Sequence, residues 1–252
     1  MLTLELSLEL ILLLFAAGAL AGFVDAIAGG GGMIALPALL FAGLTPAQAL
    51  ATNKLQGSFG TLSASWYFVR RGLVDLRAIA YMIGCTFVGS ALGTLLVQQL
   101  DPSFLTGAIP VLLILIALYF GFSPRLGEED VQQRISERAF ALTIGFGIGF
   151  YDGFFGPGTG SFFALGFVSL LGFGLTKATA HTKVLNLTSN LASLLFFVAG
   201  GQVVWTLGLV MALGQLIGGR LGAHLVVLKG AGLIRPLVVL ICVLMSLKLL
   251  LG

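Results

Sequence analysis

The chain has 252 residues, of which 58% are hydrophobic and only 9% are charged, and its mean hydropathy is +1.08. Soluble domains carry about 25% charged residues, so this composition excludes an ordinary soluble protein and predicts an all-α polytopic membrane protein embedded in a lipid bilayer. The net charge of +3 is small, and its basic residues are scattered, so we expect no nucleic-acid partner. Two lone cysteines make neither a disulfide framework nor a metal site.

The first half of the chain contains a series of apolar segments. Residues 5–24 lack the basic start of a cleaved signal peptide, and we expect them to remain as a span. Residues 33–43 are too few for a full helical crossing, which needs about 20 residues. The other segments of this half are 47–69, 76–98 and 103–122. The polar stretch 123–138, with charges of both signs, is expected to form a cytoplasmic linker loop.

The second half repeats the first. The sequence "GFVDAIAGGGG" from Gly22 resembles "GFYDGFFGPGTG" from Gly149, and "ALATNKLQGSFGT" resembles "ATAHTKVLNLTSN". Several such matches in the same order predict two homologous transmembrane repeats, residues 1–122 and 139–252. The apolar segments of the second repeat are 139–152, 161–173, 179–199, 205–227 and 232–251.

The short second segment of each repeat either crosses the membrane or turns back. Five crossings per repeat give inverted repeats, whereas four give parallel ones. Lys and Arg concentrate in cytoplasmic loops, and five crossings place nearly all of them on one side. We therefore prefer five crossings, with both termini periplasmic and the chain in a bacterial inner membrane. Inverted repeats with broken helices are typical of secondary transporters, which bind their substrate between the repeats.

The glycine-rich breaks precede the two short segments. Gly29–Gly32 and Gly156–Gly160 would free backbone N–H groups at a helix N-terminus, where an anion is favoured. Tight turns between helices are the plain alternative. The candidate anion donors are Gly30, Gly31, Gly158 and Thr159.

Two lysines occupy matching places in the third segment of each repeat. Lys54 shares a helical face with polar side chains, and so does Lys183. An intramembrane charge costs roughly 2.5–3.5 kcal/mol on insertion scales, which favours a functional role. Snorkelling to the membrane surface is the alternative. The polar neighbours that we expect to select the anion's shape are Asn53, Thr182 and Asn186.

Two aspartates, Asp25 and Asp152, lie beside the glycine breaks, 127 residues apart. Each is a candidate for carrying a coupling proton or for neutralising a lysine. Desolvation raises the pKa of a carboxyl and favours the first role, whereas a nearby cation lowers it and favours the second. Capping of freed backbone N–H groups is the structural alternative. The secondary candidates for contact with a substrate are Gln56, His181, Asn190 and Arg220.

The motifs "GFVDAIAGGGGMIALPALL", "ALATNKLQGSFGT", "GFYDGFFGPGTGSF" and "TAHTKVLN" resemble those of the TauE/SafE family, also called the sulfite exporter or toluene sulfonate uptake permease family, and especially its YfcA-like branch. The resemblance implies inner-membrane transport of sulfite, sulfonates or related anions, coupled to an ion gradient. The family's usual Gly-Thr-Ser-like motif is replaced here by Ala51–Lys54 and Ala180–Lys183, a difference that bears on which anion is carried.

The sequence thus predicts a secondary transporter for a small anion, with alternating access and a proton as the candidate coupling ion. A passive anion channel or facilitator, and a non-transporting membrane assembly factor, are the alternatives. No catalytic constellation, metal cluster or cofactor motif is present, so we expect neither an enzyme nor a cofactor. The oligomeric state stays open.

Overall fold

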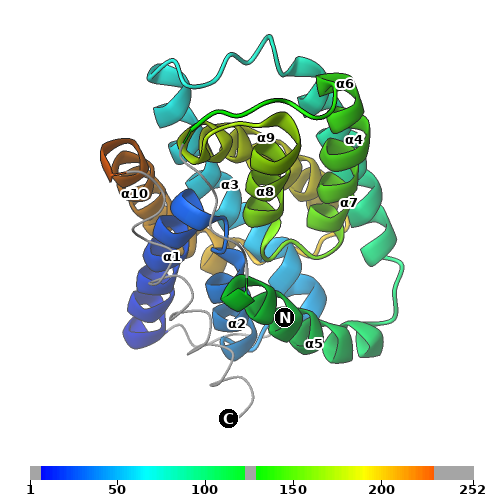
Figure 1. Ribbon diagram of the computed structural model, residues 1–252. Helices are drawn as coiled ribbons and strands as arrows, with labels where there is room; N and C mark the ends of the chain where they lie inside the picture. The colour runs from blue at the N-terminus through cyan, green and yellow to red at the C-terminus, as the bar shows by residue number, and fades with distance from the viewer. Residues whose placement is uncertain (1–6, 123–128, 230–252) are drawn as a thin grey trace.

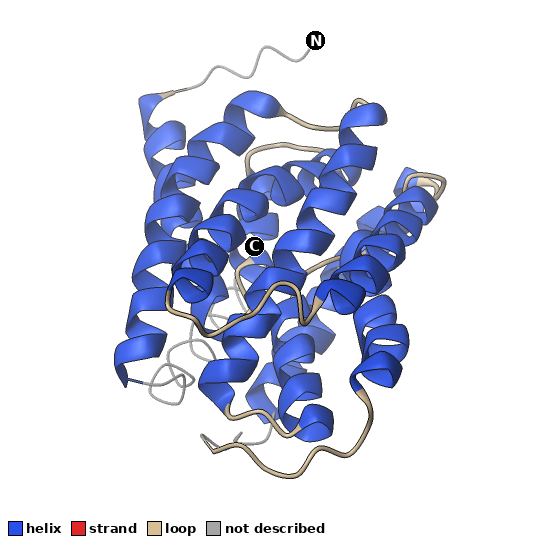
Figure 2. Ribbon diagram, turned by 90° about the horizontal axis from the view of Figure 1, so that it is seen from above, coloured by secondary structure: helices blue, strands red, loops and turns tan. Residues whose placement is uncertain are grey.

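The structure is a computed structural model that describes residues 7–122 and 129–229. Within these ranges the regular structure is entirely helical (Figure 2). The helices of the first half are α1 (Leu8–Ala28), α2 (Gly32–Phe41), α3 (Pro46–Arg70), α4 (Ala80–Val97) and α5 (Pro102–Phe122). Those of the second half are α6 (Glu137–Phe140), the π-helix η1 (Ala141–Gly145), α7 (Phe146–Phe154), α8 (Thr159–Leu171), α9 (Leu175–Ala199) and α10 (Trp205–Lys229).

These helices match nine of the ten expected segments, and the tenth, 232–251, lies outside the described residues. Among the described helices, α1, α4, α9 and α10 are long and apolar enough to cross a membrane. Helices α2 and α8 have 10 and 13 residues, which at 1.5 Å per residue is shorter than the hydrocarbon layer. The segment expected at 139–152 contains the π-helical turn η1, which apolar patterning did not indicate.

Local signals in the sequence set the helix ends. At the start of α3, Thr45 and Gln48 form a reciprocal capping box, and Pro46 occupies the first turn. Helix α1 ends at Ala28 and is capped by Gly29, whose φ of 74° is a left-handed conformation that glycine adopts without strain. In the second break, Gly156 and Gly158 have φ values of 102° and 85°. Each break therefore ends one helix and changes the direction of the chain before the next helix begins.

The two halves are interleaved, because the helix of the first segment of each half packs on the helix of the fourth segment of the other. Helix α1 lies along α10, and α7 lies along α4 (Figure 1). Small residues allow these close approaches: Gly22 faces the backbone of Gln215, and Gly149 faces that of Thr86. Helices α3 and α9 contact each other between these outer pairs. Matching helices therefore make matching contacts, as a pseudo-two-fold arrangement requires.

The bundle is apolar on its outer faces and buries an apolar core together with a set of polar side chains on α3 and α9. Large hydrophobic side chains on the outer faces of α1, α4 and α10 are exposed, among them Leu12, Leu92 and Leu213. The buried residues of α3 and α9 include charged, amide and hydroxyl side chains. An apolar surface suits a helix bundle that is surrounded by lipid, and polar side chains at membrane depth need partners inside the protein.

The described part of the linker, residues 129–136, is not helical and packs on the end of α8. The N–H of Val131 donates to the carbonyl of Gly172 at 2.7 Å. Asp130 accepts the N–H of Gly174 at 2.6 Å and the Lys177 ammonium at 2.9 Å. These donors, the Gly174 N–H first, hold the pKa of the Asp130 carboxyl below its usual range. The linker thereby fixes the start of α9.

Candidate functional site

Both central lysines form buried ion pairs with an aspartate of the other half. The Lys54 ammonium lies 2.7 Å from Asp152 Oδ1, and the Lys183 ammonium lies 3.0 Å from Asp25 Oδ2. Each ammonium also donates to the backbone carbonyl of its aspartate. The lysines are 1% and 0% exposed, so the snorkelling alternative is wrong.

The exchanged pairs connect α3 to α7 and α9 to α1, which places four charges where the two halves meet. A buried ion pair holds two charges at a desolvation cost of several kcal/mol per ion, which the mutual attraction and the extra hydrogen bonds must offset. Within the described residues, two ammonium and two carboxylate groups cancel here. The formal charges of these four side chains therefore sum to zero.

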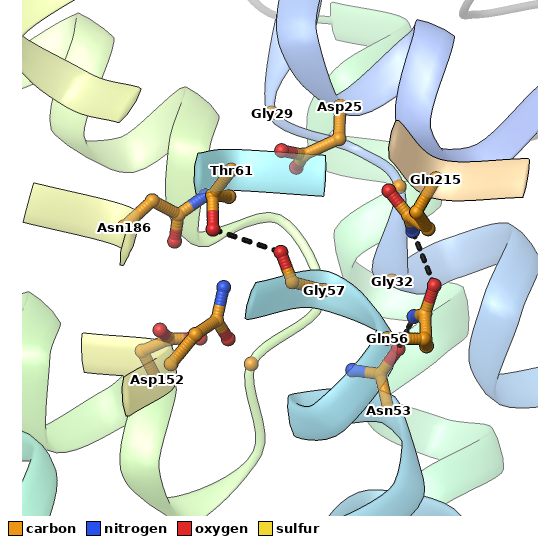
Figure 3. Close-up of a pocket in the computed structure, with 13 residues that line it drawn as sticks. Asp25, Gly29, Gly32, Asn53, Gln56, Gly57, Thr61, Asp152, Asn186 and Gln215 are labelled. Atoms are coloured by element: carbon orange, nitrogen blue, oxygen red, sulfur yellow. Dashed lines mark hydrogen bonds between the residues drawn. The ribbon is translucent and has the colours of Figure 1, made fainter. Parts of the chain in front are cut away.

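A cavity of about 30 Å³ lies beside these ion pairs, between the two halves (Figure 3). A water molecule needs roughly 10–15 Å³ of such space, so the cavity has room for water. Every residue that lines it is polar or glycine: Asp25, Gly29, Gly31, Gly32, Asn53, Gln56, Gly57, Thr61, Asp152, Gly156, Asn186, Asn190 and Gln215.

The two glycine-rich breaks meet at this cavity. Gly29 packs directly on the backbone of Gly160, and a Cβ on Gly32 would lie 3.2 Å from Pro157 Cα. The hydroxyl of Ser161, in the first turn of α8, donates to the carbonyl of Ala28. Such close backbone contact needs glycine, which explains the composition of both breaks. The N-terminal ends of α2 and α8 are thus held together at the interface.

A chain of amides lines one side of the cavity. The Gln215 amide nitrogen of α10 donates to Gln56 Oε1, and Gln56 Nε2 donates to Asn53 Oδ1 at 2.7 Å (Figure 3). These bonds orient the amide groups and leave the Asn53 amide nitrogen without a partner among the described residues. On the other side stand Asn186 and Asn190, whose side chains make no hydrogen bond within the described part of the chain. Donors are therefore available for a bound solute.

The structure gathers only part of the predicted site at the cavity. The lining includes Gly31, both aspartates, and the amides Asn53, Gln56, Asn186 and Asn190. Lys54 and Lys183 stand one layer behind it. Thr159 bonds Asp152 instead, at 2.9 Å. Gly30, Gly158 and Thr182 do not line the cavity, and the buried Thr182 hydroxyl has no partner among the described residues.

Two secondary candidates lie away from the cavity. His181 Nδ1 is 2.8 Å from the Lys177 carbonyl oxygen, one turn earlier on α9. Arg220 is exposed on α10, with its guanidinium 4.3 Å from the ring centre of Tyr67. Neither residue reaches the centre in this conformation.

Several contributors were not among the predicted site residues, including Ser189, Gln215 and Thr61. Ser189 donates to Asp152 Oδ2. It lies one turn beyond Asn186 on the polar face of α9, so helical spacing could have indicated it. Within residues 7–122 and 129–229, no group of three or more His, Cys, Asp and Glu side chains could hold a metal ion.

Comparisons with known proteins agree with a transport role. The family described as "Sulfite exporter TauE/SafE" matches residues 14–249. A "Probable membrane transporter protein" of Haemophilus influenzae is 51% identical over 97% of this chain and 96% of its own length. The "Probable membrane transporter protein YfcA" of Escherichia coli K12 is 54% identical over 94% of this chain and 88% of its own.

No solved structure matches the chain. The names of the family and of these relatives describe membrane transporters rather than enzymes. The family match spans nearly the whole of both halves, including both glycine-rich breaks and all four central charges. The chain therefore belongs to the TauE/SafE family of membrane transporters.

Proposed function

We propose that this protein is an ion-coupled secondary transporter that carries a small sulfur oxyanion, sulfite or a sulfonate, across the bacterial inner membrane. The anion binds in the cavity between the two halves. The observation that carries this proposal is the polar cavity at the point where two broken helices meet, with charges of both signs exchanged between the halves.

The donors around the cavity suit an oxyanion. The amides of Asn53, Asn186 and Asn190 line it, together with the backbone of Gly31 at the start of α2. Lys183 supplies positive charge from directly behind Asp25. The description of the family as sulfite exporters supports a sulfur oxyanion as the substrate class.

The charge balance of the centre supports coupling to a cation. Because two lysines and two aspartates cancel, an anion that enters alone leaves an uncompensated negative charge in a buried site. An anion that enters with a proton, or another small cation, keeps the centre neutral. A proton is the simpler partner because two carboxylates line the cavity.

We further propose inverted repeats of five crossings each, with both termini in the periplasm. The exchanged helix pairs, α1 with α10 and α7 with α4, fit two repeats related by a two-fold axis. The distribution of Lys and Arg favours an axis in the membrane plane. Alternating access then follows from rocking one set of helices against the other.

Transport by reconstituted protein tests the proposal. Purified protein in liposomes, with an imposed pH gradient, is given radiolabelled sulfite or methanesulfonate, and we expect uptake above the external concentration. Asn186→Leu removes a cavity amide at similar volume and should abolish uptake. Thr188→Val, on the same helix but outside the cavity lining, should preserve it.

The alternatives give different results in the same assay. Flux that equilibrates but never concentrates the anion identifies a passive facilitator. Absence of flux for every sulfur oxyanion tried, with protein that remains folded and monodisperse, contradicts transport and favours an assembly role.

A further inference from the structure

The two ion pairs at the centre differ in how fully the carboxylate is bonded. Asp152 is 2% exposed and accepts three side-chain donors. Its Oδ1 accepts from Lys54 at 2.7 Å and from Thr159 at 2.9 Å, and its Oδ2 accepts from Ser189. Both oxygens of this carboxylate therefore have hydrogen-bond donors.

Asp25 has a much more open environment. Its Oδ2 accepts from Lys183 at 3.0 Å, but its Oδ1 has no hydrogen-bond donor among the described residues. Its side chain is 15% exposed, and Figure 3 shows the carboxylate directed into the cavity. A water molecule in the cavity can therefore reach this oxygen.

The sequence explains the difference, because the hydroxyls around Asp152 are replaced by glycine around Asp25. Gly32 is the counterpart of Thr159 in the first half, because it lies the same number of residues after Asp25 as Thr159 lies after Asp152. In the same way Gly60 is the counterpart of Ser189, because it lies as far after Lys54 as Ser189 lies after Lys183. The repeat thus kept the ion pair in both halves and kept the supporting hydroxyls in only one.

We infer that Asp25 alone carries the coupling proton, while Asp152 stays ionised as a fixed counter-ion of Lys54; this rests on the proposed anion transport. A proton from the aqueous phase binds Asp25 Oδ1, and the carboxylate loses its charge. The Lys183 ammonium then lacks a counter-ion in a buried site, and the entering anion replaces the carboxylate as its partner. One proton and one anion enter together, so the charge of the centre does not change.

The surroundings of Asp25 leave Lys183 as its direct ionic partner. On its own helix, Glu9 lies more than four turns away, and α2 and α8 contain no titratable side chain. Asp152 lines the same cavity but is held by its three donors. The remaining ionisable groups of the packed helices have other described partners or lie at helix ends: Lys54, Arg70, Lys177, His181, Arg220, His224 and, at the end of α10, Lys229.

Linkage gives the size of the expected effect. If binding of one anion requires uptake of one proton, the apparent affinity rises tenfold for each unit of decrease in pH, until Asp25 is already protonated in the free protein. Below that pH, affinity no longer depends on pH. Coupling through both aspartates would instead give up to a hundredfold per unit.

The test is calorimetric titration of the purified full chain with methanesulfonate between pH 5 and 9. Methanesulfonate is chosen because its own charge does not change in this range, whereas sulfite titrates. For wild type we expect a tenfold change of Kd per pH unit, and uptake of one proton per anion when buffers of different ionisation enthalpy are compared. Asp25→Asn should bind at every pH with the affinity that wild type reaches at low pH.

The matched variant Asp152→Asn should keep the tenfold dependence, although with lower stability. If it does not fold, Ser189→Ala serves in its place and should also keep the dependence. The inference is overturned if Asp25→Asn retains the pH dependence or folds without binding, or if wild type binds with no proton uptake. If Asp25→Asn does not fold, loss of the pH dependence in Asp152→Asn, or in its substitute Ser189→Ala, overturns the inference. Absence of methanesulfonate binding to wild type at any pH contradicts the proposed substrate class instead.

Discussion

Replacing Lys54 by methionine should destabilise the protein more than any other single change at the centre. Methionine keeps most of the side-chain volume but removes the charge, so Asp152 is left as a carboxylate that is 2% exposed. Removal of one partner of a buried ion pair costs about 3–5 kcal/mol, because the remaining charge stays desolvated. At roughly 2–4 °C per kcal/mol for a chain of this size, the melting temperature should fall by about 6–20 °C.

The same change at Lys183 provides the internal comparison. It leaves Asp25, which is 15% exposed at the cavity and can take a proton from water there. We therefore expect Lys183→Met to lower the melting temperature by clearly less than Lys54→Met. Adding Asp152→Asn to Lys54→Met should recover much of the loss, because the uncompensated charge is gone.

Thermal unfolding of the detergent-solubilised variants, followed by tryptophan fluorescence or by loss of the monodisperse peak, measures these differences. Two results would refute the reasoning. Equal shifts for the two lysine variants would show that the bonding of the two aspartates does not differ energetically. A Lys54→Met variant as stable as wild type would show that its ion pair does not matter for folding.

Further predictions concern the glycine break and the linker. In Gly156→Ala the new Cβ would lie 2.9 Å from Lys54 Nζ and 3.0 Å from Asp152 Oδ1, so transport in the liposome assay should be lost. The control is Gly72→Ala, which is also at positive φ but has open space around it and should retain transport. Asp130→Asn should loosen the start of α9 at neutral pH, seen as faster amide exchange near Gly174. Because the folded-state pKa of Asp130 lies below the unfolded value of about 3.9, its contribution is present above that pH and is lost as pH falls through the folded pKa. The difference in exchange between wild type and Asp130→Asn should therefore disappear in acid; a difference that persists there would contradict the assignment.

Sequence patterns were sufficient to locate the described helices, apart from the π-helical turn η1. Local properties determine where the helices begin and end. They include the length of the apolar segments, the Thr45–Gln48 capping box, and the glycines that follow α1 and α7. The repeat identified the positions of both lysines and both aspartates without any structure. Such features depend on neighbours in the chain, so they can be read from it.

The pairing of the charges could not be read in the same way. Lys54 and Asp152 are 98 residues apart and belong to different halves, and only the interleaving of α1 with α10 and of α4 with α7 brings such residues together. The sequence leaves a lysine equally suited to a bound anion and to a carboxylate. Tertiary packing decides between them, and here each lysine has a carboxylate.

Arg220 shows how helix rotation limits a sequence interpretation. It was a candidate because it is a charge within an apolar segment. Helix α10 turns its small residues, Gly214 and Gly218 among them, toward α1, and this face determines the rotation of the helix. Arg220 lies on another face and stays exposed beside Tyr67. Without the packing partner, the sequence does not show which face is buried.

The most direct test of the central claim is to locate the anion. Crystals of the full chain, soaked at low pH with selenite as a heavier analogue of sulfite, allow selenium to be found by its anomalous scattering. The account predicts a peak in the cavity between the two halves, within hydrogen-bond distance of Asn186 and close to Lys183. A peak elsewhere with the cavity empty, at concentrations that saturate uptake, would contradict it.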